Sequence, residues 1–423
     1  MSIEGKTLAI ISAGYLGKRR SYVRLAELGA RLVVIDEPGH WSSSLVDDGI
    51  AVAWLPVAVT GDPDVDAAAI VAALAEAGIR PDGIATFWEI SIAVAARVAV
   101  LLGLPGNPPD AVDAARSKVR TRELSTALGL PTPRARRVRS LDELFAASSY
   151  VGFPAVVKPE FGAAAVGCMR VDDVESLPEV YTMVRDVVSD DEHSFFAAGN
   201  DLLVEQYLDG VEFDVDLLMH DGECVFSSVS QNWPTVEPSF QETGLHCPPD
   251  HNRRQVDRLV DLSIETAKRF GLHRGVLHIE GKCTSLGPRV IEVNARMGGG
   301  RVAEIVRAVW GVDLVEATGR AALGLGPNAK PSRKPRCTAL NVMLASPRTG
   351  RLAALRLPTE PPRGCLSLTI DDPEEVGALV TGPEDVFVSV LADITLMAKD
   401  LRDARAIAAR ILENPPVVEP ADT

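Results

Sequence analysis

The chain has 423 residues, of which 46% are hydrophobic and 24% charged, and its net charge is −15 at pH 7. This length accommodates two to four domains of roughly 100–200 residues each, with a large buried core. The negative charge argues against non-specific binding of nucleic acid or anionic lipid, because such binding rests on an excess of Lys and Arg. If the ligand is an anion, positive charge must be concentrated locally.

The sequence contains no apolar run of roughly 18 residues or more and no basic-then-apolar leader. We therefore expect a cytoplasmic protein that has neither a membrane nor a nucleic acid as partner. Its six cysteines are scattered, with no Cys-x-x-Cys pair, so the sequence indicates neither a zinc site nor a disulfide framework.

The N-terminal part alternates apolar strands with a helical stretch. Residues 7–11 and 31–35 are typical of strands, and the stretch between them that ends at Leu28 is typical of a helix. This order is a βαβ opening. We therefore predict an α/β, Rossmann-like domain over residues 1–108.

Two features of this opening weakly resemble a dinucleotide site. Gly14 and Gly17 follow the first strand, and Asp36 ends the second about where a ribose-binding acid would lie. One glycine of the fingerprint is missing, and packing of the turn explains the others equally well. A nicotinamide-dependent dehydrogenase is the alternative that these residues leave open. Glu89 fits either the edge of a substrate cleft or an acid stabilised at a helix N-terminus.

A stretch rich in Gly and Pro, residues 103–109, marks a domain boundary near residue 108. The polar helix that follows carries Lys118 between Arg116 and Arg120. On composition alone these cations form a solvated helix face supported by local ion pairs.

Residues 152–171 are typical of a buried strand, a loop of small residues and a returning strand. Lys158 ends the first strand, and the loop 162–167 reads Gly-Ala-Ala-Ala-Val-Gly. Such a loop lets backbone N–H groups approach an anion, and a lysine at its base adds a point charge for phosphates. The Walker pattern is absent. A flexible hairpin without a ligand is the alternative.

Residues 202–208 and 211–217 are typical of two strands joined by a turn. If the first strand lies at a sheet edge, the backbone of Gln206 and Leu208 could bind an adenine. The carboxylate of Glu212 could then accept hydrogen bonds from ribose hydroxyls. A polar outer face of the sheet is the alternative.

Residues 275–283 and 289–301 are typical of the two strands of a β-hairpin. If the hairpin is centred on Leu286 and has no bulge, Glu280 faces Glu292. Carboxylates directly across an antiparallel pair have Cβ atoms roughly 5 Å apart and repel each other unless a cation lies between them. Mg²⁺ suits such a site, because it is commonly shared between one or two carboxylates and the phosphates of a nucleotide.

The same register places His278 opposite Asn294, and Arg296 continues the same face of the strand. The glycine run 298–300 has no explanation in local propensity. Carboxylate, amide and guanidinium groups thus line one face of the hairpin. The glycine run next to them has a backbone with few steric restrictions. A solvated sheet face is the alternative, and it leaves the role of His278 open as a supporting group or a filler of the hairpin.

The composition changes after residue 335. Residues 339–344 are typical of a strand and residues 400–413 of a final helix. We predict a small α+β subdomain over residues 331–415, which either covers the cleft or builds a homodimer, and a disordered tail over residues 416–423.

Taken in order, these motifs resemble the ATP-grasp superfamily. The order is a helix lysine, a strand lysine before a small-residue flap, the series Glu205-x-x-Leu-x-Gly-x-Glu212 and the acidic hairpin. The length, the hairpin and the C-terminal extension are most similar to L-amino acid ligases and related carboxylate–amine ligases. The resemblance implies an α/β and α+β fold of ATP-grasp architecture, with a two-subdomain ATP-grasp module over residues 109–330 and a C-terminal α+β cap.

The resemblance also implies a role for each motif residue, with ATP and Mg²⁺ (or Mn²⁺ in its place) as cofactors. It implies nucleotide phosphate contacts for Lys118, Lys158 and Gly162. It implies an adenine and ribose site at Glu205, Gln206, Tyr207, Leu208 and Glu212. It implies metal ligation by Glu280, Glu292 and Asn294, and a place at the reacting groups for Arg296, Gly298 and Gly299. A loop of this kind in the related ligases carries an acid and a histidine near the amino acid, which here are Glu242 and His246.

The implied reaction is formation of an amide from a small-molecule carboxylate and an amine through an acyl phosphate, with release of ADP and phosphate. Many relatives have a hydroxyl residue in the flap, whereas this flap has none, so its grip on phosphate would rest on backbone donors. A carboxylase that uses bicarbonate and a noncatalytic ATP-binding module are the alternatives.

Overall fold

The N-terminal domain is a parallel sheet covered on both faces. The structure, a computed structural model, describes residues 2–189, 196, 198–383, 385 and 387–420. Leu8 and Ile10 of the first strand belong to one core cluster, and Ala9 and Ile11 belong to another. A parallel sheet buried on both sides explains why its strands are almost wholly apolar.

The strand order of this sheet is β3-β2-β1-β4. Its strands are β1 (Thr7–Ile11), β2 (Arg31–Asp36), β3 (Ala51–Pro56) and β4 (Gly83–Ala85). Its helices are η1 (Leu16–Lys18), α1 (Arg19–Glu27), η2 (Trp41–Ser43), α2 (Ser44–Asp47), α3 (Pro63–Glu76), η3 (Glu89–Ser91) and α4 (Ile92–Leu101).

Helices α5 (Pro109–Arg116) and α6 (Lys118–Ala127) lead to a small antiparallel sheet with the order β5-β8-β6-β7. Its elements are β5 (Ala135–Val138), α7 (Leu141–Val151), β6 (Ala155–Pro159), β7 (Met169–Val171), α8 (Leu177–Ser189) and β8 (Leu202–Gln206). Strand β8 pairs with both β5 and β6. The prediction that this strand lies at a sheet edge is therefore wrong, because sequence alone does not show that β5 pairs on its other side.

The largest sheet has eight strands in the order β13-β12-β9-β10-β11-β14-β18-β16. Its strands are β9 (Val211–His220), β10 (Glu223–Asn232), β11 (Gly244–Cys247), β12 (Gly275–Thr284), β13 (Gly287–Asn294), β14 (Thr338–Ala345), β16 (Cys365–Asp371) and β18 (Val390–Ala398). One face packs on α9 (Arg253–Phe270) through residues such as Leu277 and Ile279. The opposite face of β9 and β12 is polar, with Asp214 paired to Glu280.

The hairpin of β12 and β13 has the predicted pairs but a different shape. Glu280 faces Glu292 and His278 faces Asn294. The turn is tighter than predicted, since Thr284 pairs with Gly287, and a bulge follows Glu280. The assumption of a hairpin without a bulge is therefore wrong. The tighter turn and the extra residue offset each other, so the register at the acidic pair is preserved.

The C-terminal region extends the largest sheet, because β14, β18 and β16 continue it beyond β11. The remaining elements are α10 (Val302–Trp310), α11 (Leu314–Ala322), β15 (Gly350–Ala354), β17 (Leu379–Val380), α12 (Leu401–Leu412) and β19 (Val417–Glu419). Strand β19 pairs with β15. The predicted disorder of the tail is therefore wrong for Val417–Glu419, where Val418 is buried in the core. Residues 421–423 of the predicted tail lie outside the described residues.

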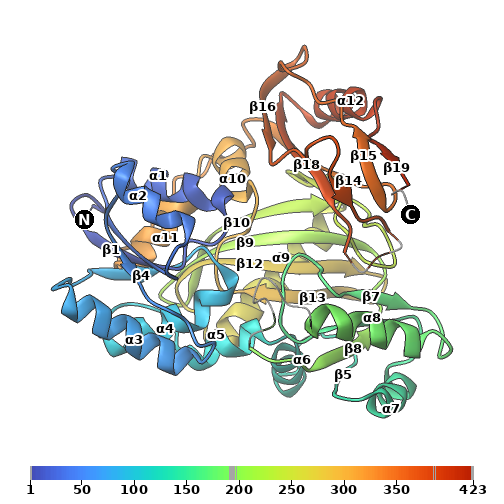
Figure 1. The fold of residues 1–423 in the computed structure, drawn as a ribbon, viewed down its shortest axis with the longest axis horizontal. Helices are drawn as coiled ribbons and strands as arrows, with labels where there is room; N and C mark the ends of the chain where they lie inside the picture. Colours follow the sequence, from blue (N-terminus) through green and yellow to red (C-terminus); the bar gives the residue numbers. More distant parts are fainter. Residues whose placement is uncertain (1, 190–195, 197, 384, 386, 421–423) are drawn as a thin grey trace.

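Figure 1 shows how these parts surround the site. The N-terminal domain (blue) and the small antiparallel sheet with α7 and α8 (green) lie on different sides of the central strands β9, β10 and β12, and the C-terminal region (red) lies at a third. Among the described residues, no helix has the length and apolar character needed to cross a bilayer.

Candidate active site

Two cavities meet above the polar face of the largest sheet. The narrower, of about 150 Å³, lies between this sheet and the small antiparallel sheet, and the wider, of about 970 Å³, is walled by the N-terminal domain and the C-terminal strands. Glu280, Glu242 and Arg296 line both. The narrow cavity is lined by most of the predicted site residues: Lys118, Lys158, Gly162, Glu205, Gln206, Tyr207, Leu208, Glu212, Glu242, Glu280, Glu292, Asn294 and Arg296.

Lys118 is positioned by the start of α6. Ser117 caps this helix, since its Oγ accepts a hydrogen bond from the Arg120 N–H at 3.0 Å, and it also contacts Glu160 at the end of β6. The Nζ of Lys118 lies 3.3 Å from Glu292 Oε2 and 3.4 Å from the carbonyl oxygen of Gly162 in the flap. Burial alone would lower the pKa of Lys118, but Glu292 raises it. The lysine thus enters the cavity as a cation.

The flap over the two cavities has an unusual backbone. Ala164 and Ala165 have φ values of 54° and 56°, a left-handed conformation that side chains other than Gly, Asn and Asp rarely adopt. Ala163 and Ala164 line both cavities. Successive turns of this kind form concave arrays of N–H groups that suit anions. The geometry agrees with phosphate binding by backbone donors.

Glu205 is 4% exposed and held between two cations. Its carboxylate is paired with Lys158 and lies 2.8 Å from Arg122 Nε. Burial would raise the pKa of Glu205, but Arg122 and Lys158 lower it to about 2. The Glu205 carboxylate is therefore held by ion pairs with Arg122 and Lys158. Its contact with an adenine stays a prediction.

The backbone at the end of β8 has fewer free hydrogen-bonding groups for the predicted adenine than expected. The N–H of Gln206 donates to the Arg134 carbonyl at 2.8 Å, and the N–H of Tyr207 donates to the Pro154 carbonyl at 3.2 Å. The Leu208 carbonyl accepts from Lys282 Nζ at 3.3 Å. Glu212 follows across the turn, with its Oε2 3.6 Å from the same lysine.

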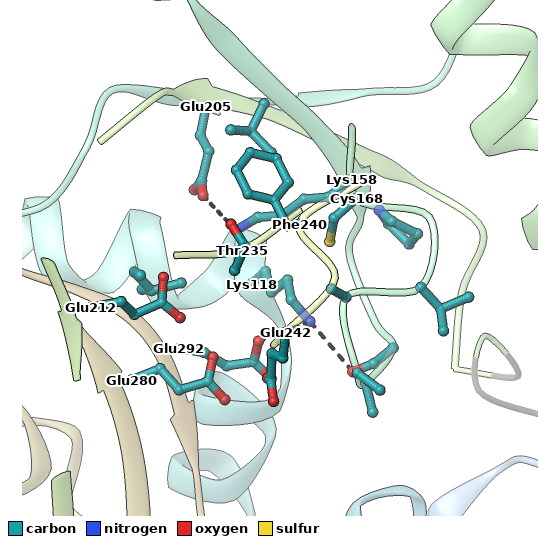
Figure 2. A pocket seen from close by; sticks show the side chains of 18 of the residues that line it. Lys118, Lys158, Cys168, Glu205, Glu212, Thr235, Phe240, Glu242, Glu280 and Glu292 are labelled. Carbon is teal, nitrogen blue, oxygen red and sulfur yellow. Dashed lines mark hydrogen bonds and ion pairs between the residues drawn. The ribbon is translucent and has the colours of Figure 1, made fainter. Parts of the chain in front are cut away.

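Thr235 and Phe240 are among the residues of the same cavity that were not predicted from the sequence. Figure 2 shows Thr235 and Phe240 entering it from the loop between β10 and β11. That loop is attached to the flap strand, because Arg170 on β7 pairs with Glu237 and its N–H donates to the Pro238 carbonyl at 2.9 Å. A polar, proline-bounded loop in the sequence indicates a cavity wall, but not which of its side chains point inward.

Glu280 and Glu292 lie side by side where the cavities meet, close to Glu242 (Figure 2). Burial and the facing Glu292 carboxylate raise the pKa of Glu280 well above its usual value. Burial also opposes ionisation of Glu292, but Lys118, Lys158 and Arg296 together lower the pKa of that carboxyl. Each carboxylate would be more easily ionised with a divalent cation between them.

The groups around this pair fit a metal that is shared with a nucleotide. The Oδ1 of Asn294, which accepts from Arg296 at 3.3 Å, and the two carboxylates are oxygen ligands of the kind that Mg²⁺ takes, whereas the buried Nδ2 of Asn294 has no partner and can only donate a hydrogen bond. Among the described residues, no three His, Cys, Asp or Glu side chains gather into a metal site of their own. Mg²⁺ needs only one or two carboxylates when phosphate oxygens and water complete its octahedron.

Arg296 is held across the domain boundary by Glu89. The Nε of Arg296 lies 2.6 Å from Glu89 Oε2, and its Nη1 donates to the Met297 carbonyl at 3.0 Å. Glu89 is buried and lines the wide cavity. Both interpretations of Glu89 hold, because it begins η3, the turn that leads into α4, and its side chain lines the wide cavity.

The glycines after Arg296 differ in their surroundings. A Cβ on Gly298 would lie 2.8 Å from His278 Nδ1, so this glycine permits close packing and does not line either cavity. Gly299 has open space at the Cβ position and lines the wide cavity. An N–H contact from either glycine to substrate stays a prediction.

Glu242 and His246 have different surroundings: Glu242 precedes β11 and lines both cavities, whereas His246 lies within β11 and lines neither. Leu245 lines the wide cavity, whereas the neighbouring His246 points to the other side, where its Nδ1 accepts from Trp233 Nε1 at 3.2 Å. The structure does not bring His246 to either cavity, and its substrate contact stays a prediction that this geometry does not support. Burial and Asp214 raise the pKa of Glu242 to about 7.

His278 supports the floor of the wide cavity. Its Nδ1 lies 2.9 Å from Asp216 Oδ1, and its Nε2 lies 3.9 Å from Glu280 Oε1. Burial would lower the pKa of His278, but Asp216 raises it to about 9. His278 thus carries positive charge beneath the acidic pair.

The residues that favoured a dinucleotide site serve the N-terminal domain itself. Asp36 is buried, and its Oδ2 accepts from the Ala13 N–H at 2.8 Å and from Ser42 Oγ at 3.0 Å. A Cβ on Gly14 would lie 3.0 Å from the Trp88 ring, so packing accounts for this glycine. A dehydrogenase has no further support.

Comparison with known proteins agrees with this geometry. The model of the ATP-grasp domain matches residues 151–304, and that of the ATP-grasp N-terminal domain matches residues 25–106. Carnosine synthase 1 of Gallus gallus is 33% identical over 369 residues, which are 82% of this chain and 38% of that protein. Alanine–anticapsin ligase of Bacillus subtilis is 24% identical over 249 residues, 56% of this chain and 52% of that protein.

The chain spans about two fifths of the length of the carnosine synthases that it matches. Among solved structures, L-amino acid ligase from Bacillus licheniformis superposes with a TM-score of 0.81 over 99% of this chain and 100% of that one, at 22% identity. The predicted fold is confirmed. These matches together show that the chain belongs to the ATP-grasp superfamily, whose members use ATP with a divalent metal.

Proposed function

We propose that the protein is an ATP-dependent ligase that joins the carboxylate of an amino acid or similar acid to an amine through an acyl phosphate. The observation that carries this proposal is the acidic pair Glu280 and Glu292 at the meeting point of two cavities. One cavity has the cations and backbone donors that a nucleotide needs, and the other has room for two small substrates. The relatives of this chain include a carnosine synthase and an alanine–anticapsin ligase.

Glu280, Glu292 and Asn294 would hold Mg²⁺, with Mn²⁺ as a substitute. When bound, the metal neutralises charge on the phosphates as the phosphoryl group is transferred. Lys118, which lies between Glu292 and the flap, would bind the transferred phosphoryl group from the other side. Such reactions depend mainly on positioning and charge neutralisation.

In the first step a carboxylate oxygen of the acid attacks the γ-phosphorus of ATP. The bond from that phosphorus to the β–γ bridging oxygen breaks, and ADP leaves. In the second step the amine nitrogen attacks the acyl carbon, the bond from that carbon to the phosphate oxygen breaks, and the nitrogen loses a proton. Arg296, in contact with both cavities, would stabilise the negative charge that develops on the carbonyl oxygen.

A carboxylase that uses bicarbonate is the alternative. Biotin carboxylase structures do share the fold, with a TM-score of 0.68 at 16% identity for the Campylobacter jejuni protein, but this likeness concerns the fold alone. The similarity in sequence to a carnosine synthase and to an alanine–anticapsin ligase favours the ligase. ATP and small molecules are its proposed partners, and a homodimer stays a prediction.

The proposal is tested by incubating the protein with ATP, Mg²⁺ and pooled L-amino acids, while phosphate release is followed and products are identified by mass. We expect phosphate and an amide in equal amounts. For Arg296→Ala we expect ATP to bind nearly as in the wild type, with turnover lowered by roughly 10²–10³. ATP binding without phosphate release for any pair would instead indicate a noncatalytic module. Near-normal turnover of Arg296→Ala would discard the role given to this residue.

A further inference from the structure

Lys18 is a buried lysine at the wall of the wide cavity. It ends η1, the single turn that joins β1 to α1, and is 5% exposed. Its Nζ lies 5.5 Å from the centre of the Tyr15 ring. In the part of the chain that the structure describes, no carboxylate lies within 4.0 Å of this Nζ and no hydrogen bond from it is found. A buried charge without a partner is costly, so its presence needs an explanation.

The other cations near Lys18 already have anionic partners. Arg20 lies 3.1 Å from Glu304 and donates to the Gly300 carbonyl at 2.6 Å, and Arg296 is held by Glu89. These contacts place the turn of Lys18 against residues 299–301 at the start of α10. No side chain caps that helix, so its first N–H groups add positive potential to the same wall. Lys18 and this helix end therefore favour an anion from outside the chain.

The anion expected at Lys18 is not the carboxylate that reacts with ATP. The reacting carboxylate must reach the γ-phosphate beside Glu280 and Glu292, in the contact zone of the two cavities. Lys18 lines only the wide cavity, on the side of the N-terminal domain. When two amino acids are joined, one carboxylate is consumed and the other survives in the product. The surviving carboxylate belongs to the substrate that supplies the amine.

We propose that Lys18 binds a carboxylate of the amine-donating substrate that takes no part in the reaction. The amine is then an amino acid, and the product is a peptide with a free terminal carboxylate. This inference rests on the proposed ligase function and specifies one of its two substrates. Burial, followed by repulsion from Arg296 and Arg20, lowers the pKa of Lys18 to about 7, and a bound carboxylate would favour the charged form again.

The test compares each proteinogenic L-amino acid with its α-carboxamide as the amine substrate. The reaction contains ATP, Mg²⁺ and the acid that the experiment with pooled amino acids identifies as the substrate. The variant is Lys18→Met, which removes the charge and keeps an unbranched side chain. Arg19→Met is the matched control, because Arg19 lies on the surface of the same turn, 2.8 Å from Asp48. Arg116→Met tests another cation of the wide cavity, whose guanidinium lies over the Phe161 ring.

In the wild type and Arg19→Met we expect a clear preference for the amino acid over its carboxamide. Lys18→Met should lower kcat/KM for the amino acid by roughly 10- to 100-fold, the usual worth of a charge-assisted hydrogen bond, and leave that for the carboxamide nearly unchanged. Calorimetry should show the same selective loss for the product peptide against its amide.

Equal losses for both amines in Lys18→Met, or loss of the preference in Arg116→Met instead, would overturn the role of Lys18. A wild type that joins carboxamides as readily as amino acids would overturn the inference while leaving the ligase function intact. A wild type that forms no amide with any pair would contradict the ligase function itself, so the two failures are distinguishable.

Discussion

Replacing Lys18 with methionine should stabilise the protein in the absence of substrate. The pKa of Lys18 falls from 10.5 to about 7, first because of burial and then because of Arg296 and Arg20. Folding therefore disfavours the protonated side chain, and the folded state binds fewer protons than the unfolded state between these two pH values. A methionine of similar length avoids this penalty.

The size and sign of the effect follow from linkage. Each pKa unit corresponds to 1.36 kcal/mol, so charged Lys18 costs at most about 5 kcal/mol below pH 7. The cost declines as pH rises from 7 toward 10.5 and is about 1.4 kcal/mol at pH 9.5. The stability gained by Lys18→Met should therefore be largest in mildly acidic solution.

Urea denaturation of wild type and Lys18→Met near pH 6 and pH 9.5 measures this difference directly. The difference between the free energies of unfolding of the two proteins cancels the pH dependence of most groups outside the site. Lys6→Met is the control, because Lys6 is exposed and lies 3.0 Å from Asp82 on the surface; its effect should be small at both pH values. A gain for Lys18→Met that is equal at both pH values, or a loss at both, would refute the reasoning.

Two other substitutions test the contacts that hold the site. Glu205→Gln should lower the free energy of unfolding by about 3–5 kcal/mol at neutral pH, because Lys158 and Arg122 stay buried without their partner. The pKa of Glu205 is lowered to about 2, so its stabilisation is complete above its unfolded pKa and is lost as pH falls toward 2; urea denaturation at neutral and acidic pH checks both points. Glu89→Gln should reduce turnover roughly tenfold with little change in the KM for ATP, since it weakens the contact that orients Arg296, and steady-state kinetics with ATP as the varied substrate would show this.

The sequence predicted the acidic pair because strand alternation depends on neighbouring residues. Period-two patterns determine which side chains share a face, and the hairpin joins the two strands locally. The bulge after Glu280 was not predicted. The residue that the bulge leaves unpaired, Ile291, is bonded to a distant part of the chain, since Arg122 on α6 donates to its carbonyl at 2.6 Å. A contact of this kind leaves no periodic signal.

The errors at β8 and in the C-terminal region have a common physical origin. Whether a strand is an edge depends on partners such as β5, which lie far away in the chain. The C-terminal strands join the central sheet through β11 and β14, where Leu245 pairs with Asn341. Local composition shows that a strand forms there, but the free energy that selects its neighbour comes from long-range packing.

Lys18 could not have been singled out from its neighbours in the sequence. Its importance depends on burial, on the absence of a carboxylate partner, and on Gly300 and Glu304, which are almost three hundred residues away. The sequence contains several lysines and arginines beside it, and Arg19 and Arg20 find anionic partners. Only the folded chain separates Arg19 and Arg20, which have anionic partners, from Lys18, for which the described residues provide no carboxylate within 4.0 Å.

The groups proposed for the reaction and those proposed for the choice of amine come from different segments of the chain. The acidic pair and Asn294 come from one hairpin of the central sheet, so their geometry is fixed by local strand pairing. The wide cavity is walled by Lys18 in the N-terminal turn and by Asp393 in the C-terminal strands, which contribute no groups to the narrow cavity. Because these two side chains lie outside the narrow cavity, substitutions of them should change which amine is accepted while ATP-dependent phosphoryl transfer to the acid is preserved.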